Sequence, residues 1–290
     1  MKTIVLTGAS SGFGLLVLKR LVVKKHRVVA TVRGSSDRIL HDPALKEAHQ
    51  NGLLIVLDVH MERPDTFALI KETLSQKCDG RLDALINNAG YGVLRPIELQ
   101  TPEQIKHQFQ VNVFAPIELT RLLLPEIKKA KGRIINISSI AGLMSFPFYG
   151  IYSATKHALE AASEALRTEL APFGVQVSLV EPGGFRTEFA KRSLSLGQST
   201  GAQSLACGDY SHWVKNFDQF LDSKKEIGGN PDRVAALIVR LCEQKRIPLH
   251  NVIGADAQAL KILSAFLPKP LEFWIKHHLF KRQVFKDHLR

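Results

Sequence analysis

A tyrosine and a lysine stand four residues apart near the middle of this chain, in the stretch YSATK. The Ala- and Leu-rich residues that follow predict a helix, so Tyr152 and Lys156 share one helical face. A phenol ordinarily loses its proton near pH 10, and a neighbouring ammonium lowers that pKa. The pair therefore predicts acid–base chemistry near neutral pH, although a core tyrosine beside a solvated lysine would give the same spacing.

A glycine-rich turn, TGASSGFG (7–14), follows the apolar run TIVLT and opens a predicted helix at 13–25. Glycines let the backbone approach a pyrophosphate, and a helix N-terminus supplies free N–H groups and positive potential. The spacing is neither G-x-G-x-x-G nor a P-loop. A tight turn without a ligand would use the same residues, but the first strand–helix junction favours a dinucleotide site.

The end of the second predicted strand indicates which dinucleotide binds. An NAD site carries an acidic residue there, whereas ATVRGSSDR offers Arg33 with Ser35, Ser36 and Arg38 close by. A guanidinium and hydroxyls suit a 2′-phosphate, so NADP is favoured over NAD. The alternative is that Arg33 is an ordinary surface arginine. Asp58, at the end of the third strand, is expected near the adenine edge.

Short apolar runs alternate with helical patterns along the chain, which predicts a doubly wound parallel α/β sheet with helices on both faces, the Rossmann fold. Capping patterns predict helix starts at Thr101 and Asn230. We expect one domain over 1–258, with a mobile substrate loop at about 185–229 and a C-terminal helical extension at 259–290. The predicted strands are 3–7, 27–32, 53–59, 82–88, 132–138 and 175–182.

Composition excludes several classes of protein. The three cysteines are scattered without metal-ligand spacing, so we expect neither a disulfide framework nor a metal site. No signal peptide and no membrane-spanning run are expected, which predicts a soluble, cytoplasmic protein. The net charge of +12 suits an anionic ligand, membrane surface or nucleic acid. Without zinc-finger spacing or a basic helix interleaved with aromatics, nucleic acid is not the expected partner.

Six motifs then occur in a consistent order: TGASSGFG, NNAG (87–90), VNVFAP (111–116), NISS (136–139), YSATK and EPGGFRT (181–187). With these the chain closely resembles the short-chain dehydrogenase/reductase superfamily over about residues 1–190. The stretches SGFG, NNAGYGVLRPIE and ALRTELAPFGVQVSLVEPGGFRT are most similar to the steroid/retinol dehydrogenase-like branch and to bacterial NADP-dependent aldehyde or ketone reductases.

The resemblance implies a catalytic set of Asn112, Ser139, Tyr152 and Lys156. Tyr152 would be the general acid for carbonyl reduction or the base for alcohol oxidation, and Ser139 would donate a hydrogen bond to the substrate oxygen. Lys156 would hold the cofactor ribose, and Asn112 a water that links Lys156 to solvent. Tyr149 has no lysine at i+4, and Ser138 does not have the implied spacing to Tyr152.

The implied cofactor site extends over the ends of several strands. Thr187 would bond the nicotinamide carboxamide, and Lys156 and Tyr152 would also contact the cofactor. The other implied cofactor residues are Gly8, Ser10, Ser11, Gly12, Phe13, Gly14, Arg33, Asp58, Val59, Asn88, Ala89, Gly90, Pro182 and Gly183.

Apolar and aromatic residues beside Ser139 predict a lipophilic substrate, such as an aldehyde, ketone, retinoid or steroid. Met144, Phe148, Tyr149 and Phe185 are the candidate substrate contacts; their alternative role is to cap the core or to fill a subunit contact. The stretch 259–290 is apolar and basic together, and Leu271 and Trp274 lie on its apolar stripe. It predicts either peripheral membrane contact or packing on the domain or a neighbouring subunit.

The sequence thus favours an NADP(H)-dependent oxidoreductase acting on a lipophilic carbonyl or alcohol. Two alternatives stay open: a non-catalytic NADP(H)-binding scaffold or sensor, and a basic-surface protein bound to nucleic acid or membrane. The resemblance also implies a homodimer or homotetramer.

Overall fold

The computed structural model describes residues 1–34, 36–189, 193, 196, 210–224 and 228–284. Its core is a parallel sheet of seven strands in the order β3-β2-β1-β4-β5-β6-β7. The order reverses between β1 and β4, and ligands of such sheets bind beyond the carboxyl ends of the strands at that reversal. The strands are β1 (Thr3–Leu6), β2 (Arg27–Val32), β3 (Leu54–Asp58), β4 (Ala84–Asn87), β5 (Arg133–Ile137), β6 (Gln176–Pro182) and β7 (His250–Ile253).

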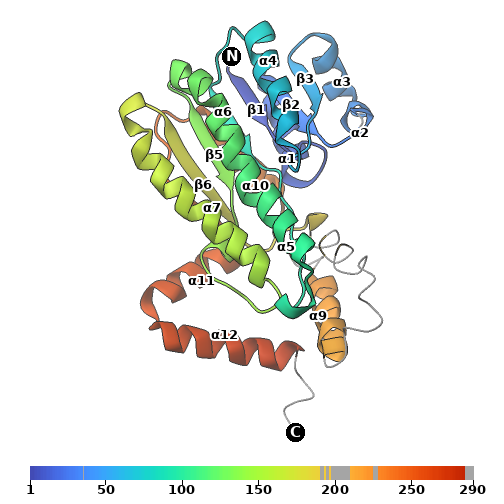
Figure 1. Ribbon diagram of the computed structural model, residues 1–290, viewed down its shortest axis with the longest axis vertical. Coiled ribbons are helices and arrows are strands. Elements are labelled where there is room, and N and C mark those ends of the chain that lie inside the picture. Colours follow the sequence, from blue (N-terminus) through green and yellow to red (C-terminus); the bar gives the residue numbers. More distant parts are fainter. Residues whose placement is uncertain (35, 190–192, 194–195, 197–209, 225–227, 285–290) are drawn as a thin grey trace.

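Helices cover both faces of the sheet (Figure 1), because its strands are apolar on both sides. In β1, Ile4 and Leu6 belong to one buried cluster and Val5 to the other. The first face is covered by α1 (Gly12–Val23), α3 (Pro43–Gln50) and α10 (Asp232–Glu243). The second is covered by α4 (Ala68–Lys77), α6 (Ala115–Ala130) and α7 (Gly150–Glu169). The predicted Rossmann architecture is therefore confirmed, with each of the six expected strands present.

The capping predictions differ in outcome. Thr101 caps α5 (Pro102–Phe109) through a full capping box with Gln104, as expected. The second helix starts later than predicted: α10 begins at Asp232 with Pro231 at the N-cap, and the Asn230 side chain accepts a hydrogen bond from the Asp232 N–H. The Pro231 carbonyl accepts from the Ala235 N–H at 3.2 Å, so Pro231 and not Asn230 provides the N-cap.

The strand β7 has no counterpart in the predicted set. Its residues, HNVI, are all only partly buried, and two of the four are polar. The strand lies at the edge of the sheet, paired only with β6. An edge strand this short gives no apolar run, which is why the periodicity missed it.

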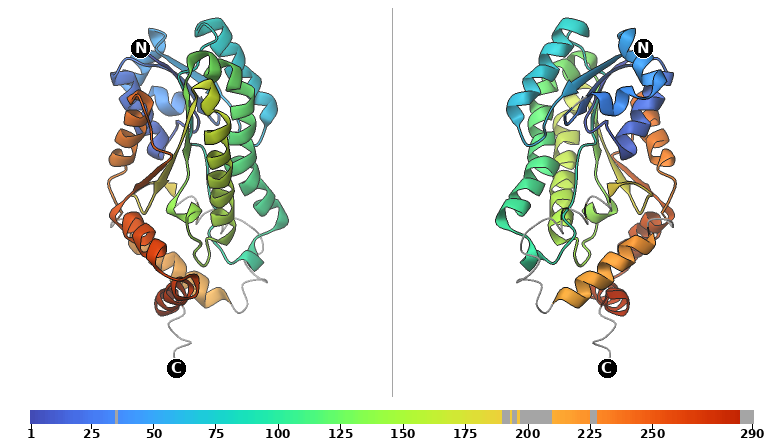
Figure 2. Two further views of the ribbon diagram at one scale, coloured as in Figure 1. Left: turned by 90° about the vertical axis from the view of Figure 1, so that its left-hand side faces the viewer. Right: turned by 90° about the vertical axis from the view of Figure 1, so that its right-hand side faces the viewer.

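Three helices gather beyond the ends of the strands, away from the sheet (Figures 1 and 2). They are α9 (Ser211–Lys224), α11 (Ala255–Phe266) and α12 (Lys269–Val284). We call them the helical cap. The expected substrate loop at 185–229 falls partly on 190–192, 194–195, 197–209 and 225–227, which lie outside the described residues. The division at residue 258 stays a prediction, as does a cytoplasmic location.

Two predictions from composition concern the cysteines and the absence of membrane-spanning helices. Cys78 and Cys242 are buried free thiols, and Cys207 lies outside the described residues. No helix in the described ranges combines the length and the apolarity needed to cross a membrane.

The short helix α2 (Asp37–Leu40) completes the region after β2.

Candidate active site

The glycine loop turns tightly after β1 and leads into α1. Gly8 has φ +67°, and a Cβ there would lie 2.9 Å from the Cα of Ala89. A Cβ on Gly14 would lie 2.2 Å from the carbonyl oxygen of Gly8. Both positions therefore require glycine; Gly12 also favours glycine through its φ of +55°, although a Cβ there would face open space. The loop therefore packs tightly against the segment that follows β4, and it faces open space at Gly12.

Hydrogen bonds join this loop to the NNAG segment after β4. The Thr7 hydroxyl accepts from the N–H groups of Asn88 and Ala89, each at 3.0 Å. The Asn88 amide donates to the carbonyls of Thr7 and Gly8 at 2.9 and 3.1 Å. Asn88 thus holds the two loops at the point where the strand order reverses, a role that the resemblance did not supply.

The residues present fit a dinucleotide at this edge. The first turn of α1 contains no acidic residue, and the side chain of its N-cap, Ser11, makes no capping hydrogen bond. The N–H groups of a first helical turn have no partner within the helix and face positive potential outward. Ser10, Ser11, Gly12 and Phe13 are partly exposed around that opening. An anionic pyrophosphate suits this environment.

Arg33 is exposed at the end of β2, the position at which the sequence predicts a residue that favours NADP over NAD. The pKa of the Glu62 carboxyl is lowered against the effect of burial by hydrogen bonds with the backbone and His60, and the charge of Arg33 adds to that lowering. Asp58 accepts a hydrogen bond from Gly34 N–H at 2.8 Å and pairs with His60 at 3.1 Å. Asp58 therefore shapes the turn that carries Arg33. Val59 is buried, and its N–H donates to the carbonyl of Val32.

Ser139, Tyr152 and Lys156 come together beyond the end of β5. Ser139 lies just after that strand and hydrogen bonds with the Tyr152 phenol, near the start of α7. Lys156 lies one turn further, 5.7 Å from the Tyr152 ring centroid, and donates to the carbonyl of Ile137 at 2.8 Å. Lys156 is only 5% exposed, so it is not a solvated helix lysine. Ser138 instead faces Glu160, further along α7.

The expected lowering of the Tyr152 pKa is wrong for the protein without cofactor. Burial raises the pKa of Tyr152 above its ordinary value, and the hydrogen bond with Ser139 opposes that rise only in part. Burial also lowers the pKa of Lys156 to about 8, so its own charge is destabilised. A neighbouring ammonium lowers the pKa of a phenol, but desolvation of both groups, which depends on the fold, acts in the opposite direction. A protonated phenol is the form that a general acid requires.

Asn112 lies in a π-helical segment, Gln110–Phe114, that joins α5 to α6. Such segments often mark functional positions. Its amide donates to the Tyr91 carbonyl at 2.7 Å and to the Thr155 hydroxyl at 3.1 Å, and its oxygen accepts from Tyr91 N–H at 3.0 Å. Asn112 therefore ties the loop after β4 to α7. The water relay to Lys156 stays a prediction.

Glycines let the loop after β4 approach the catalytic candidates. A Cβ on Gly90 would lie 3.5 Å from the Lys156 ammonium, and one on Gly92 would lie 2.8 Å from the Tyr152 ring. Gly92 was not among the sequence candidates. Its GYG context after NNAG was the available signal, but the close approach depends on how α7 packs.

The segment after β6 follows a strand on the β4–β7 side of the point where the strand order reverses. Pro182 ends β6, and Asp256 accepts a hydrogen bond from Gly184 N–H at 2.7 Å beside Gly183. Thr187 is partly buried, and its hydroxyl accepts from Phe189 N–H. Phe185 packs edge-to-face on Phe13 of the glycine loop, at 5.9 Å between ring centroids. That contact sets Phe185 apart from the other aromatic substrate candidates.

Tyr152 also belongs to a cluster of aromatic residues. Phe148 packs on Phe217 of α9 and Phe280 of α12, with ring centroids 4.7 and 5.4 Å apart. Phe189 lies 5.3 Å and Tyr149 6.4 Å from the Tyr152 ring. Met144 is buried outside this cluster. Phe148 has φ +66°, a strained conformation for an aromatic residue.

A buried ion pair anchors α9 to the domain. Arg95, 6% exposed, donates to both carboxylate oxygens of Asp218 at 2.9 and 3.2 Å. Neither residue was a sequence candidate, because a pair separated by 123 positions leaves no local signal. The arrangement as a whole places a phenol between polar groups from the sheet edge and aromatic rings from the helical cap.

Comparison with known proteins is consistent with this geometry. A family model described as short chain dehydrogenase matches residues 2–195. A 3-ketodihydrosphingosine reductase of Bacteroides thetaiotaomicron is 34% identical over 258 residues, 89% of each chain. An NADPH-dependent 3-dehydrocapnine reductase of Ornithobacterium rhinotracheale is 33% identical, over 92% of this chain and 93% of its own. Human retinol dehydrogenase 8 is 32% identical, over 86% of this chain and 80% of its own.

A solved structure is similar over almost the whole length. A short-chain dehydrogenase from Streptomyces avermitilis superposes with a TM-score of 0.69 at 30% identity, covering 96% of this chain and 97% of its own. The likeness therefore includes the helical cap region as well as the motif-bearing sheet.

Proposed function

Because this chain belongs to the short-chain dehydrogenase/reductase family, and is thus an oxidoreductase acting on alcohol or carbonyl groups with a nicotinamide cofactor, we propose that it uses NADPH to reduce a lipophilic carbonyl compound. One observation carries the proposal. The buried Tyr152 phenol interacts with Ser139 and lies near Lys156, and its ring belongs to a cluster of aromatic residues. A polar proton donor in apolar surroundings suits a carbonyl on an apolar molecule.

In this proposal Tyr152 donates its proton to the substrate oxygen, and Ser139 stabilises the charge that develops there. Lys156 holds the cofactor ribose and favours reprotonation of the phenol from solvent. NADPH supplies a hydride when it is bound. Burial of Tyr152 supports the acid role, because it keeps the phenol protonated until the substrate oxygen gains charge.

The preference for NADP rests on Arg33. It is exposed at the end of β2, and no acidic residue occupies that strand end. The relative named NADPH-dependent supports the same cofactor. The glycine loop would hold the pyrophosphate, and Asn88, Ala89 and Gly90 would line the cofactor further along the edge.

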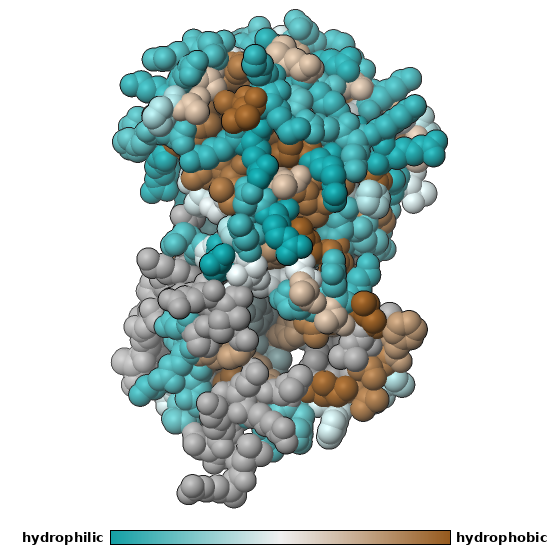
Figure 3. Space-filling view, turned by 180° about the vertical axis from the view of Figure 1, so that it is seen from behind, coloured by the Kyte–Doolittle hydropathy of each residue, from teal (hydrophilic) through white to brown (hydrophobic). Residues whose placement is uncertain are grey.

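We also propose that the helical cap touches a membrane surface. The end of α11 and the start of α12 expose Ile262, Phe266, Leu271, Phe273 and Trp274, which are 43 to 84% exposed. Figure 3 shows apolar side chains gathered at this corner. Such a surface, on a protein of net charge +12, suits the boundary of an anionic bilayer, where lipophilic substrates partition.

A non-catalytic NADP(H)-binding sensor is the second candidate. It would bind the cofactor through the same loop without turnover, and the buried Lys156 and the Ser139–Tyr152 hydrogen bond would have no purpose. Cofactor binding alone therefore does not separate the two functions.

A substrate screen coupled to NADPH oxidation separates them. We expect turnover with long-chain ketones, retinaldehyde or oxosteroids, and much less with short hydrophilic carbonyls of the same reactivity. Tight NADPH binding without turnover on any of these compounds would favour the sensor. Turnover that is indifferent to substrate chain length would contradict a lipophilic site.

A further inference from the structure

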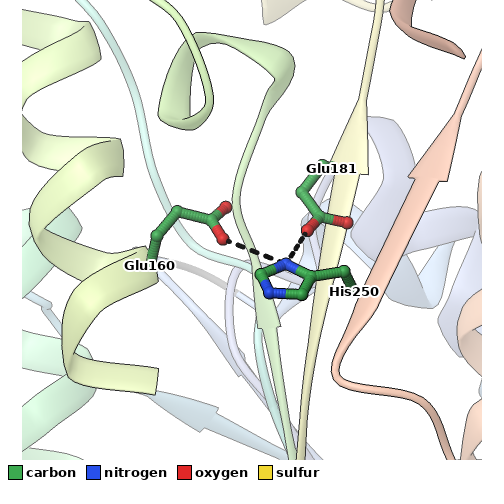
Figure 4. A group of neighbouring side chains, drawn as sticks. All are labelled: Glu160, Glu181 and His250. Carbon is green, nitrogen blue, oxygen red and sulfur yellow. Dashed lines mark hydrogen bonds and ion pairs between the residues drawn. The ribbon is translucent and has the colours of Figure 1, made fainter. Parts of the chain in front are cut away.

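Three side chains from three elements converge about two helical turns along α7 from Tyr152 (Figure 4). Glu160 comes from α7, Glu181 from β6 and His250 from β7, and one ligand atom of each lies within 4.8 Å of the others. The His250 Nδ1 atom is 2.7 Å from Glu181 Oε1 and 3.7 Å from Glu160 Oε2. We call these three residues the acid–histidine cluster.

The carboxylate of Glu160 is aimed into this cluster without a hydrogen-bond partner. Glu160 is 5% exposed, and neither of its carboxylate oxygens makes a hydrogen bond. Ser138 lies close enough to lower the pKa of Glu160, yet its buried hydroxyl makes no hydrogen bond either. Buried carboxylates normally have partners, and leaving one without costs stability.

Carboxyl groups also gather here in a protein that is basic overall. Glu181 is fully buried beside Glu160, and burial raises the pKa of both carboxyls. The positive Lys156 lies one turn before Glu160, but its ammonium donates to a backbone carbonyl. The exposed Glu164 adds a carboxylate 3.7 Å from His250 Nε2. Burial is the largest influence on the pKa of Glu160 and Glu181, and the charges of Lys156 and Lys261 oppose its effect only in part.

We propose that Glu160, Glu181 and His250 bind a divalent cation of the Zn²⁺ or Mn²⁺ class. One imidazole nitrogen and two carboxylate oxygens form a familiar donor set for these ions, with water in the remaining positions. Two carboxylates and a neutral imidazole balance the ion's charge. A metal-bound nitrogen at ~2.0–2.2 Å requires only that His250 exchange its hydrogen bond with Glu181 for a bond to the metal.

Two neighbouring groups are placed to orient the ligands of a metal ion, as outer-sphere partners do. Glu181 Oε2 accepts from Asn251 N–H at 2.7 Å, which leaves Oε1 directed at the cluster. Glu164 is positioned to accept from His250 Nε2–H when Nδ1 binds the metal. The His250 side chain is 33% exposed, so an ion can enter from solvent.

A bound ion would cross-link α7 to β6 and β7 without touching Tyr152. Its first consequence is therefore stability, since a ligand that binds only the folded chain shifts unfolding by mass action. The ion would also place positive charge one turn from Lys156. This inference does not depend on the proposed function, because binding is measured on the protein without cofactor or substrate.

The test uses the full-length protein after treatment with EDTA. Mn²⁺ binding is followed by electron paramagnetic resonance, and Zn²⁺ by calorimetry and by the shift in unfolding temperature. We expect one site whose affinity falls at least tenfold in Glu160→Gln and in His250→Asn. Glu169→Gln, an exposed position on the same helix, should bind as the wild type does.

Several outcomes would overturn the proposal. Equal binding by the wild type and both cluster variants would assign the ion to other surface histidines. No binding of either ion at millimolar concentration would mean that the three residues share a proton and do not form a metal site. If Glu160→Gln does not fold, retained Mn²⁺ affinity in a folded His250→Asn still contradicts the site. NADPH binding by each variant serves as the check on folding.

Discussion

The edge of the sheet and the helical cap both contribute to the surroundings of Tyr152, and they are built differently. At the sheet edge the loops are held by close packing at Gly8 and by the side-chain amides of Asn88 and Asn112, which donate to backbone carbonyls. In the cap, aromatic rings from α9 and α12 pack on Phe148, and one ion pair anchors α9. The polar side is suited to hold a cofactor rigidly, whereas the apolar side is suited to accept varied substrates.

The largest expected effect is a loss of turnover when Tyr152, where the two regions meet, is changed. Tyr152→Phe removes the proton donor and keeps the ring, so kcat should fall by ~10²–10⁴-fold while NADPH affinity is retained. Steady-state rates and fluorescence titration with NADPH measure the two quantities. Tyr149→Phe is the matched control, because that ring lies in the same cluster without a lysine one turn on. Full activity in Tyr152→Phe would remove the proposed mechanism.

The buried charge of Lys156 should be visible in the stability of the protein without cofactor. Its pKa is lowered from 10.5 to about 8, so the charged form costs roughly 3 kcal/mol below pH 8. Between about pH 8 and 10.5 the folded chain loses this proton before the unfolded chain does, and stability therefore rises. We expect wild type to gain stability relative to Lys156→Met over that range.

Urea unfolding in EDTA at several pH values measures this difference. Lys46→Met, at an exposed position on α3, should follow the wild type. A constant difference between wild type and Lys156→Met from pH 7 to 10.5 would show that Lys156 is solvated.

Arg33→Asp changes the sheet edge alone. Losing a charge-assisted contact to a 2′-phosphate and adding repulsion should weaken NADPH binding by ~10–100-fold and improve relative use of NADH. Separate KM values for the two cofactors provide the measurement. Lys46→Asp alters the net charge equally and should leave the ratio unchanged. Unaltered selectivity in Arg33→Asp would exclude it as the selector.

Asp218→Ala changes the cap alone. Arg95 would be left buried without its carboxylate partner, and α9 would lose its anchor. We expect the KM for a lipophilic substrate to rise by about tenfold, with KM for NADPH much less affected. Gln219→Ala, exposed on the same helix, is the control. Equal changes in both KM values would mean that the two regions are not functionally separate.

The smallest expected effect concerns the outer surface of the cap. Phe273→Ser combined with Trp274→Ser should reduce co-sedimentation with vesicles of anionic lipid by about fivefold, because two exposed apolar side chains are lost. Activity on a detergent-dispersed substrate should not change. Leu69→Ser with Phe173→Ser removes exposed apolar groups elsewhere. If that pair reduces binding equally, the contact is not specific to the cap.

Much of the sheet edge was predictable because its signals are local. A buried strand is a continuous apolar run, and a tight strand-to-helix turn requires glycine at fixed places, so Gly8 and Gly14 stand out in one short stretch. Ser139 and Tyr152 were expected together because the resemblance pairs them through short motifs at a fixed spacing. What the sequence could not supply was the environment: desolvation reverses the expected direction of the Tyr152 pKa.

By itself the sequence determined the Rossmann architecture, the family and the set of candidate catalytic residues, since these depend on periodicity and on motifs a few residues long. Only the tertiary structure decided the rest. The Arg95–Asp218 pair, the aromatic cluster and the acid–histidine cluster include contacts between residues 69 to 132 positions apart, on elements whose packing no local pattern records. The physical reason is that burial and proximity, which decide charge and chemistry, belong to the folded chain and not to any segment of it.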